Sequence, residues 1–336
     1  MQTLPPLPEW LQMEHKVAQI LTEQELHGWH FNERKAYELE STLRTELESL
    51  SRSLRERFPY VPTKEFTPSR NNKTRGYVKD CTFTRITELN VTSRDHIAWV
   101  MGWHFKWEAV EFTASGKPTI DEVVLKDIGT PLALEFLRCL DISKALGMLS
   151  EGVNAWLRLV REERIHHHCS VATNTYRCAH RKPNLGQVKS DKEFRELFEA
   201  TPGQTMVGAD LSGIELRMLA HYLARFDGGR YAEILLHGDI HQVNADKIGV
   251  TRRQVKTISY AFLYGAGVTK IGRTYDPQLT EKEARKKGRE IYEAYMDAIP
   301  GLKKLVTAVK SKAECGYINL CDGRRCFVDG GHKALN

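Results

Sequence analysis

The chain has 336 residues, of which 41% are hydrophobic and 27% charged, and its formal net charge is +6 at pH 7. This length allows a large core in two or more lobes and excludes a disordered tail or a miniprotein. No apolar run reaches the roughly 18 residues of a membrane span, and the first residues, MQTLPPLPEW, lack the basic and apolar regions of a signal peptide. We therefore expect a soluble cytoplasmic protein.

The cysteines and the net charge indicate the redox compartment and the kind of partner. Seven cysteines are an odd number, and none forms a CxxC pair. They are interpreted as free thiols in a reducing compartment. The positive charge weakly favours a polyanionic partner, because neutralising phosphates releases counterions.

The first half of the chain is predicted to be mostly helical. Residues 9–58 combine apolar positions at helical spacing with a charged amphipathic run. Residues 59–92 break this periodicity with Pro, Asn and Gly and are rich in Lys and Arg. That composition predicts an irregular basic loop, which either contacts nucleic acid or is only solvated. Helical patterns return at residues 94–104, 119–127 and 130–160.

The second half mixes strand-like and helical patterns. RIHHHCSVAT at 164–173 and QTMVGADL at 204–211 are typical of strands. Helices are expected at 213–226, from 228 through the stretch RRQVKTISYAFLYGAG at 252–267, at 279–297 and on to about residue 315. The end, from residue 316, predicts a short hairpin.

One helical stretch carries a stripe of functional side chains. Arg252, Lys256, Tyr260 and Tyr264 follow one another at four-residue spacing, which places them on one helix face. At about 1.5 Å rise per residue the stripe is roughly 18 Å long, cationic at its start and aromatic at its end. Such a stripe could bind an anion at its cationic end and stack on a flat group at its aromatic end.

Two carboxylates accompany the strand-like QTMVGADL. Asp210 would end this strand, and Glu215 would lie one turn into the following helix. A carboxylate at a strand end can bind Mg²⁺, which takes few protein oxygens and keeps its other positions for water and phosphates. The alternative is that Asp210 only caps the helix.

A second cationic group precedes the stripe. Asp239 is predicted to cap the helix that begins near His241. His241 is either structural or, beside Arg252 and Lys256, completes a cationic cluster for a triphosphate. Upstream, Arg177, Arg181 and Lys182 crowd a segment that ends in a Pro-Asn turn at Asn184. This segment is either a solvated basic loop or follows a phosphodiester backbone.

These stretches resemble a known enzyme family. DLSGIELRMLAHYLARFDGG resembles motif A, and RRQVKTISYAFLYG resembles motif B, of the family A (DNA polymerase I type) DNA polymerases, especially their bacteriophage branch. TYRCAHRKPNLGQV, GDIH and CDGRRCFV resemble further family segments in the family's order, and TSRDHI and GWHFN resemble sequence in and near the thumb. The resemblance covers nearly the whole chain.

The resemblance implies roles for the stripe and its neighbours. Arg252, Lys256 and His241 would contact the phosphates of the incoming dNTP, with Lys256 also catalytic. Tyr260 would lie against the sugar and base of that dNTP. In the family, Tyr at this position is associated with tolerance of dideoxynucleotides. Asp210 matches the motif A metal ligand, and Glu215 matches the residue that excludes a ribose 2′-hydroxyl.

The resemblance also implies a DNA-binding set. Arg177 matches a residue that contacts the primer end, and Tyr264 would stack near the templating base. The remaining members are Gly265, Arg181, Lys182 and Asn184. The chain departs from the family pattern at Tyr176, where a Gly is usual, so the local backbone is expected to differ.

The second catalytic aspartate of the family is not found. Its two-metal chemistry uses a later HDE motif, motif C, and no HDE occurs in this sequence. Asp121 and Glu122 lie far upstream and are interpreted as a surface helix start. Motifs of a 3′–5′ exonuclease are also not found. We expect a split polymerase, completed by a second polypeptide with the C-terminal palm and served by a separate exonuclease.

Two further features concern a possible metal ion and a possible protein partner. The run HHHC at 166–169 suggests zinc, but residues in a strand alternate faces, so at most two can converge on one ion, and a palm strand is favoured. Phage relatives of this type often recruit a host processivity factor through a long thumb insertion. Residues 59–92 occupy that place but are shorter, which leaves this partner open.

The resemblance thus implies an α/β (α+β) right-hand polymerase fragment, with mostly helical thumb and fingers and an incomplete antiparallel palm sheet. The expected parts follow one another along the chain: a palm-approach helix at 1–30, the thumb at 31–163, the palm at 164–235, the fingers at 236–315 and the start of the C-terminal palm at 316–336. With its complement it would copy primer–template DNA using dNTPs and Mg²⁺. The alternatives are an inactive primer–template binding protein and, more weakly, a single-subunit RNA polymerase.

Overall fold

The computed structural model describes residues 6–173, 175–276 and 279–328, apart from the side chain of residue 64. The chain forms two compact units. Unit 1 comprises Met1–Thr22, Ser170–Ala179 and Val207–Asn336, and unit 2 comprises Glu23–Cys169 and His180–Met206. Helix α1 (Glu9–His27) runs across the division between them.

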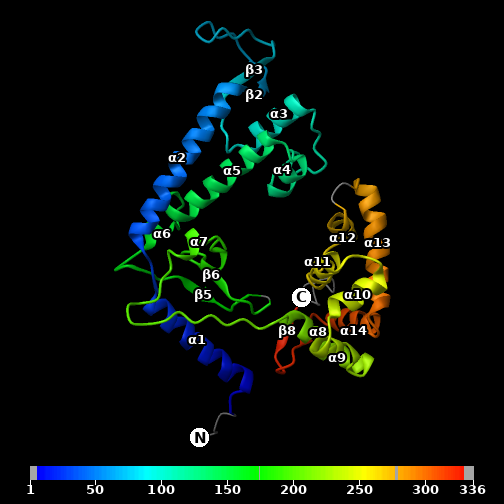
Figure 1. Cartoon of the computed structure of the whole chain (residues 1–336). Helices are drawn as coiled ribbons and strands as arrows, with labels where there is room; N and C mark the ends of the chain where they lie inside the picture. Colours follow the sequence, from blue (N-terminus) through cyan, green and yellow to red (C-terminus); the bar gives the residue numbers. More distant parts are fainter. Residues whose placement is uncertain (1–5, 174, 277–278, 329–336) are drawn as a thin grey trace. The chain divides into compact units, whose positions relative to one another are not determined.

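Unit 2 contains two long helices and several short elements, labelled where there is room in Figure 1. The helices are α2 (Glu33–Arg57), α3 (Arg94–Phe105), α4 (Glu122–Ile128), α5 (Pro131–Leu146), a π-helix (Gly147–Glu151), α6 (Trp156–Leu159), a 3₁₀ turn (Leu185–Gln187) and α7 (Lys192–Arg195). The strands form three two-stranded sheets. Two of them are antiparallel: β1 (Trp29–His30) with β4 (Arg164–Ile165), and β2 (Tyr60–Phe66) with β3 (Phe83–Glu88). In the third, β5 (His168–Ser170) pairs with β6 (Ala179–Arg181).

Helix α2 packs along α5 because its few apolar residues share one face. Ala36, Leu43 and Leu54 are its buried residues, and they join cores that also contain Phe136 and Ile142 of α5. Charged side chains cover the rest of α2. The predicted helix over 9–58 is therefore two helices, interrupted at Gly28, whose positive φ of 66° suits glycine.

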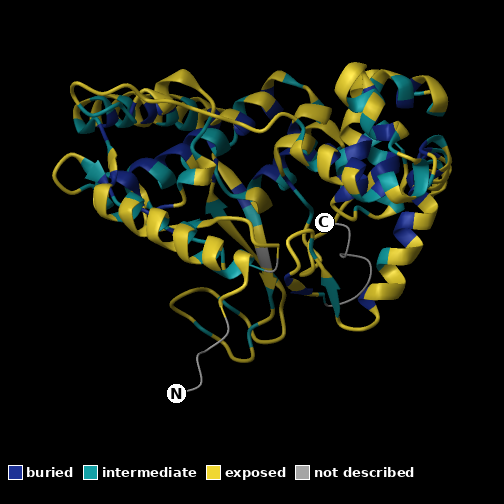
Figure 2. Ribbon diagram, turned by 90° about the horizontal axis from the view of Figure 1, so that it is seen from below, coloured by how far each residue is buried: buried dark blue, intermediate teal, exposed yellow. Residues whose placement is uncertain are grey.

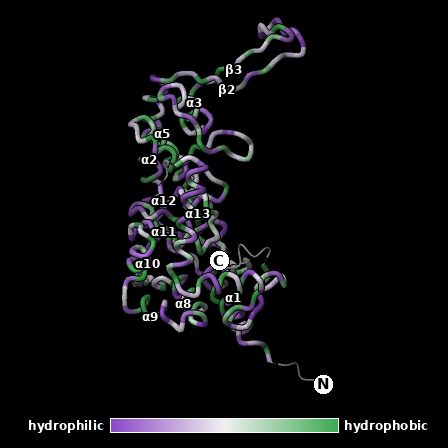
Figure 3. Tube along the Cα trace, turned by 90° about the vertical axis from the view of Figure 1, so that its right-hand side faces the viewer, coloured by the Kyte–Doolittle hydropathy of each residue, from purple (hydrophilic) through white to green (hydrophobic). Residues whose placement is uncertain are grey.

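The predicted basic loop at 59–92 is largely a β-hairpin. Strands β2 and β3 pair antiparallel from Tyr60 opposite Glu88 to Phe66 opposite Phe83. The rings of Phe66, Tyr77 and Phe83 lie 5.0–6.0 Å apart and form a small aromatic core at its end. In Figure 3 the hairpin extends away from α3 and α5. The expectation of an irregular loop was wrong for 60–66 and 83–88, which pair as strands with one register shift between Pro62 and Lys64. It holds for 67–82, which contains turns and one isolated bridge.

Unit 1 is mainly helical. After α1 its helices are α8 (Ile214–Asp227), α9 (Arg230–His237), α10 (Ile240–Ile248), α11 (Arg252–Leu263), α12 (Val268–Tyr275), α13 (Glu281–Ala298) and α14 (Leu302–Ala313). The antiparallel hairpin of β7 (Tyr317–Asn319) and β8 (Arg325–Phe327) follows. It confirms the hairpin predicted for this region.

The core of unit 1 gathers apolar residues from α8 to α14. Buried residues lie where neighbouring helices meet, and exposed residues cover the outer faces (Figure 2). Helices α12 and α13 cross closely, because Gly272 faces the backbone of Ala284 and Gly288 faces the backbone of Val268. A Cβ atom at either glycine would lie far inside van der Waals contact with the opposite helix.

The strand predicted for residues 204–211 is not formed. This segment is extended but unpaired in the described structure, and α8 begins four residues after Asp210, with Gly213 at its N-cap. The apolar run has no partner strand among the described residues, and an unpaired segment cannot form a ladder. No helix in the described ranges is long and apolar enough to span a membrane.

Candidate nucleotide-binding site

Helix α11 presents a polar face because its other face is anchored in the core. Thr251 accepts a hydrogen bond from the Gln254 amide, and the Gln254 side chain accepts one from the Thr251 amide, which forms a capping box. Val255, Ile258 and Phe262 are buried on the core side. The opposite face therefore presents Arg252 and Lys256, which are exposed, and Tyr260, which is half-buried.

The predicted stripe is shorter than expected at its aromatic end. Helix α11 ends at Leu263, and Tyr264 is its C-cap residue, with φ −80° and ψ 8°. Gly265 follows with a positive φ of 71°, a conformation that favours glycine. Arg252, Lys256 and Tyr260 share the helix face as predicted, whereas Tyr264 leaves the helix at its end.

Helix α10 adds His241 and Asp239 beside the start of α11. Asp239 accepts hydrogen bonds from the amides of His241 and Gln242, both at 3.1 Å, which confirms its predicted capping role. Its other oxygen accepts a 2.7 Å bond from Arg252 Nε. This bond with Arg252 is the largest of several contacts that lower the pKa of the Asp239 carboxyl. The Asp239 carboxylate thus caps the N-terminus of α10 and fixes the Arg252 side chain.

His241 contributes a neutral ring to this group. Burial, followed by the charge of Arg252 and more weakly that of Lys256, lowers its pKa, and Asp239 only partly opposes this. Its Nδ1 is buried and has no partner among the described residues. The ring lies 6.5 Å from that of Tyr260, centroid to centroid. The predicted cationic cluster therefore rests on Arg252 and Lys256, and His241 supplies hydrogen-bonding nitrogens instead of charge at pH 7.

A second group joins three predicted residues from distant positions. Tyr264 donates a 3.0 Å hydrogen bond to the Glu215 carboxylate. Arg177 donates one of 3.3 Å to the Tyr264 hydroxyl, lies 5.1 Å over its ring and is 3.9 Å from Glu215. Glu215 and Tyr264 also affect Tyr260, since burial and then their nearby charges raise its pKa. Tyr260 is thus near His241 and within electrostatic range of Glu215 and Tyr264.

Asp210 is the remaining predicted carboxylate of unit 1. It is exposed in the extended segment before α8 and does not cap that helix. The described residues contain no group of three or more His, Cys, Asp or Glu arranged to hold a metal ion. Mg²⁺ needs only one or two carboxylates when phosphates and water fill its other positions, so the donor type of Asp210 fits this ion.

Comparison with known proteins decides the family. A family model described as DNA polymerase family A matches residues 65–334. The chain belongs to DNA polymerase family A. The DNA-directed DNA polymerases of Enterobacteria phage T3 and Escherichia phage T7 are each 30% identical to it, over 98% of this chain and 57% of their own length. The chain thus spans little more than half the length of these relatives.

A solved structure shares the fold. The polymerase domain of Pol1 from M. smegmatis, in complex with DNA primer–template and dNTP, matches with a TM-score of 0.70 at 19% identity, over 96% of this chain and 55% of that chain. The mixed α/β architecture, mostly helical with small antiparallel pairs, therefore matches a family A polymerase domain. This confirms the predicted fold class.

The remaining predicted residues of the family A segment at 175–188 lie in a different unit from Arg177. Arg177 belongs to unit 1, whereas Arg181, Lys182 and Asn184 belong to unit 2. Arg181 and Lys182 are exposed, and Asn184 caps the 3₁₀ turn by accepting a bond from the Gly186 amide at 3.1 Å. The segment is therefore divided between the units.

The histidine run of unit 2 has structural contacts. The side chains of His166 and His168 contact Glu25, at its carbonyl oxygen (2.8 Å) and its carboxylate (2.9 Å) respectively. His167 is 2% exposed and stacks on His180 at 5.2 Å. Burial lowers the pKa of His167, followed by the charge of His180. The alternation of faces agrees with the strand interpretation.

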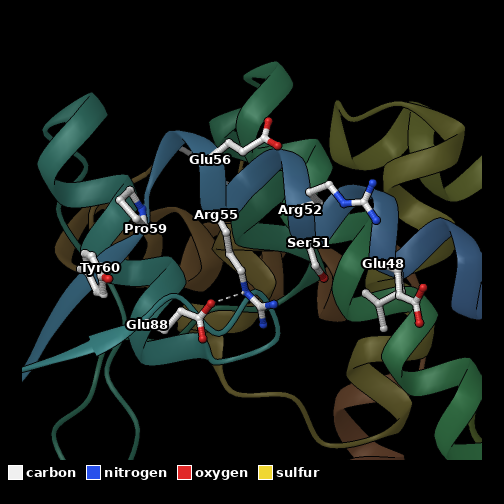
Figure 4. Close-up of a pocket in the computed structure, with 9 residues that line it drawn as sticks. Glu48, Ser51, Arg52, Arg55, Glu56, Pro59, Tyr60 and Glu88 are labelled. Carbon is white, nitrogen blue, oxygen red and sulfur yellow. Dashed lines mark ion pairs between the residues drawn. The ribbon is translucent and has the colours of Figure 1, made fainter.

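Unit 2 has a surface hollow that is lined by none of the predicted site residues. It has a volume of about 680 Å³ and lies along α2 and the start of β2 (Figure 4). Arg55 and Glu88 form a 3.7 Å ion pair in it. Its lining is mixed and charged, with Glu48, Arg52 and Glu56 exposed to solvent.

Proposed function

We propose that this chain carries the nucleotide-binding and primer-end-binding part of a template-directed DNA polymerase. One observation carries the proposal: the polar face of α11, with Arg252, Lys256 and Tyr260, stands beside His241 and is separated from a well-packed core face. The proposal includes the assignment of residues 31–163 to the thumb, 164–235 to the palm and 236–315 to the fingers.

The cationic end of α11 would bind the triphosphate. The guanidinium of Arg252 offers two parallel hydrogen bonds to phosphate oxygens, and Lys256 offers a compact charge that can follow the negative charge developing on the leaving pyrophosphate. His241, neutral because of its surroundings, would donate one hydrogen bond to a phosphate oxygen. These contacts would align the α-phosphorus with the attacking primer oxygen.

The other end of the site would select the sugar. Tyr260 is proposed to lie against the sugar and base of the dNTP. Glu215 is held by Tyr264, whose hydroxyl donates to it at 3.0 Å. A carboxylate fixed in this way would exclude a 2′-hydroxyl, so the site would favour deoxyribonucleotides. Arg177, which is bonded to the same Tyr264, would contact the primer end.

Asp210 would hold Mg²⁺. When bound, this ion lowers the pKa of the primer 3′-hydroxyl and neutralises phosphate charge. The second carboxylate of a two-metal site is proposed to come from a polypeptide outside this sequence, which is the split-polymerase hypothesis. A separate exonuclease and a host processivity factor are further proposed partners, of which the second is the less supported.

Primer extension tests the proposal. The chain would be incubated with a primed DNA template, dNTPs and Mg²⁺, first alone and then with a polypeptide that carries the motif C region of a family A polymerase. We expect extension only in the mixture, and its loss with Asp210→Ala. Arg253→Ala is the matched control, because Arg253 is an exposed cation of the same helix to which the proposal assigns no contact with the nucleotide.

The rival function gives a different result. An inactive primer–template binding protein would bind primed DNA and show no extension in either mixture. Extension by the chain alone would refute the need for a complementing polypeptide and leave the polymerase assignment intact. Template-dependent incorporation of ribonucleotides in preference to deoxyribonucleotides would favour an RNA polymerase.

A further inference from the structure

Tyr176 adopts a backbone conformation that tyrosine rarely takes. Its φ is +54°, in the left-handed region, where a side chain crowds its own backbone and glycine is the usual residue. The amide of Tyr176 donates to the carbonyl of Thr173 at 3.1 Å, which closes a turn. A bulky residue persists in such a conformation only where its surroundings stabilise it.

Arg324 supplies these surroundings. Its guanidinium carbon lies 4.8 Å over the Tyr176 ring and 5.6 Å over the Trp10 ring. The Arg324 side chain is only 8% exposed and forms ion pairs with Glu14 at 2.5 Å and Asp322 at 2.6 Å. Because both carboxylates neutralise it, the buried guanidinium is held in one place and offers a flat, fixed surface to the tyrosine.

The tyrosine ring has a second anchor on the same hairpin. Its hydroxyl donates to the carbonyl of Arg325 at 3.3 Å. The ring is thus bound at its face by Arg324 and at its tip by the backbone of β8. Trp10 and Glu14 belong to α1, so three separate segments of unit 1 meet at this arginine.

The next residue in the chain is Arg177, whose side chain reaches Tyr264 and Glu215. A residue is oriented by the backbone of its predecessor, and here that backbone is held in a strained conformation by the contacts of the Tyr176 ring. The ring of Tyr176 touches none of the nucleotide-binding side chains in the contacts described above. It acts on the site only through Arg177.

We propose that Tyr176, clamped by Arg324 and the Arg325 carbonyl, is a positioning residue that orients Arg177 toward the primer end. The inference rests on the proposed polymerase function. In this chain a stacked tyrosine holds a backbone conformation that glycine would adopt without such contacts. The direction of the Arg177 side chain therefore depends on the β7–β8 hairpin and on α1.

A double-mutant cycle tests the proposal. The affinity of the full chain for primer–template DNA would be measured by fluorescence anisotropy, with a paired and with a mismatched primer end, for the wild type, Tyr176→Ala, Arg177→Ala and the double variant. We expect Tyr176→Ala to weaken binding of the paired end about tenfold and, in the Arg177→Ala background, to weaken it less than about twofold. Binding of the mismatched end should change less.

Two further variants separate positioning from folding. Tyr176→Phe keeps the stacked ring and should retain most of the affinity. Tyr275→Ala is the matched control, because Tyr275 also stacks with a cation, Lys287 at 5.0 Å, but lies in α12, outside the β7–β8 hairpin and α1; it should change the affinity less than about twofold. Thermal unfolding of each variant shows whether the fold is intact.

The outcomes are distinct. Equal losses from Tyr176→Ala in both backgrounds, or no loss in the wild-type background, would overturn the positioning role while leaving the polymerase function in place. A wild-type chain that does not bind primer–template DNA would overturn the proposed function, and the positioning role with it.

Discussion

The polar face of α11 and the crossing of α12 with α13 lie in the same unit but are built on opposite principles. At the crossing, Gly272 and Gly288 remove every side-chain atom so that two backbones meet. On the polar face, Arg252 and Lys256 point into solvent, and Arg252 has Asp239 as a close partner. One region excludes water by close packing, and the other keeps its charges accessible.

This difference separates stability from binding within a few turns of helix. The stability of a close-packed region depends on the volume of its side chains, since protein interiors have almost no free space. Exposed charges contribute little to folding, because water screens them in both states. Substitutions on the polar face should therefore alter binding alone, and substitutions at the crossing should alter stability first.

The largest effect is expected for Lys256→Ala. Loss of a charge that stabilises the transferred phosphates should lower kcat/KM for dNTP by about 100- to 1000-fold in the complemented enzyme. The free energy of unfolding should change by less than about 0.5 kcal/mol. Steady-state extension and urea denaturation measure the two quantities. Arg253→Ala, as control, should change neither, and a large loss of stability in Lys256→Ala would break the comparison.

The next effect is expected for Gly288→Ala at the crossing. The added methyl group would collide with the carbonyl of Val268, so the helices must separate, and the free energy of unfolding should fall by about 3 kcal/mol. Urea denaturation measures this. Gly147→Ala is the control, because Gly147 has a helical φ of −58° and its added Cβ would lie in open space beyond its own helix backbone. It should be neutral or slightly stabilising.

A smaller effect is expected at the cap that supports the polar face. Asp239→Ala removes the acceptor for two amides at the start of α10 and should lower the temperature of thermal unfolding by about 2 °C. Asp239→Asn keeps the cap and loses only the exposed ion pair with Arg252, so it should lower that temperature by less than about 1 °C. Equal losses in thermal unfolding would mean that the ion pair, and not the cap, stabilises this end.

The smallest effect is a pH dependence from His241. Its folded-state pKa lies below the unfolded value of about 6.5, so its contribution is fully present above about pH 6.5 and is lost as the pH falls through the folded pKa. The wild type should therefore lose more stability than His241→Gln between about pH 7.5 and about pH 5.5. Parallel slopes in urea denaturation at these two pH values would contradict the lowered pKa.

Local signals in the sequence predicted much of this molecule. The spacing of Arg252, Lys256 and Tyr260 placed them on one helix face, and the capping of α10 by Asp239 and of α4 by Asp121 was anticipated. Such features depend on residues within one helical turn, so the sequence is sufficient to predict them. The motifs were long enough to indicate the family that the comparisons then established.

Tertiary contacts decided the rest. The run before Asp210 has strand-like residues but no partner strand in the described structure, and the basic stretch at 59–92 became a hairpin through pairing that its Pro, Asn and Gly concealed. The neutrality of His241 depends on burial by other elements. Arg177 and Tyr264 meet although 87 positions separate them.

The sequence by itself therefore determined most of the helical content of unit 1, the cap of α10, the face that carries the charges and the family. Only the tertiary structure decided which distant side chains meet, which histidine loses its charge and how Tyr176 holds a conformation suited to glycine. The physical reason is range. Helical periodicity and capping act over three or four residues, whereas strand pairing, desolvation and stacking depend on segments that folding alone brings together.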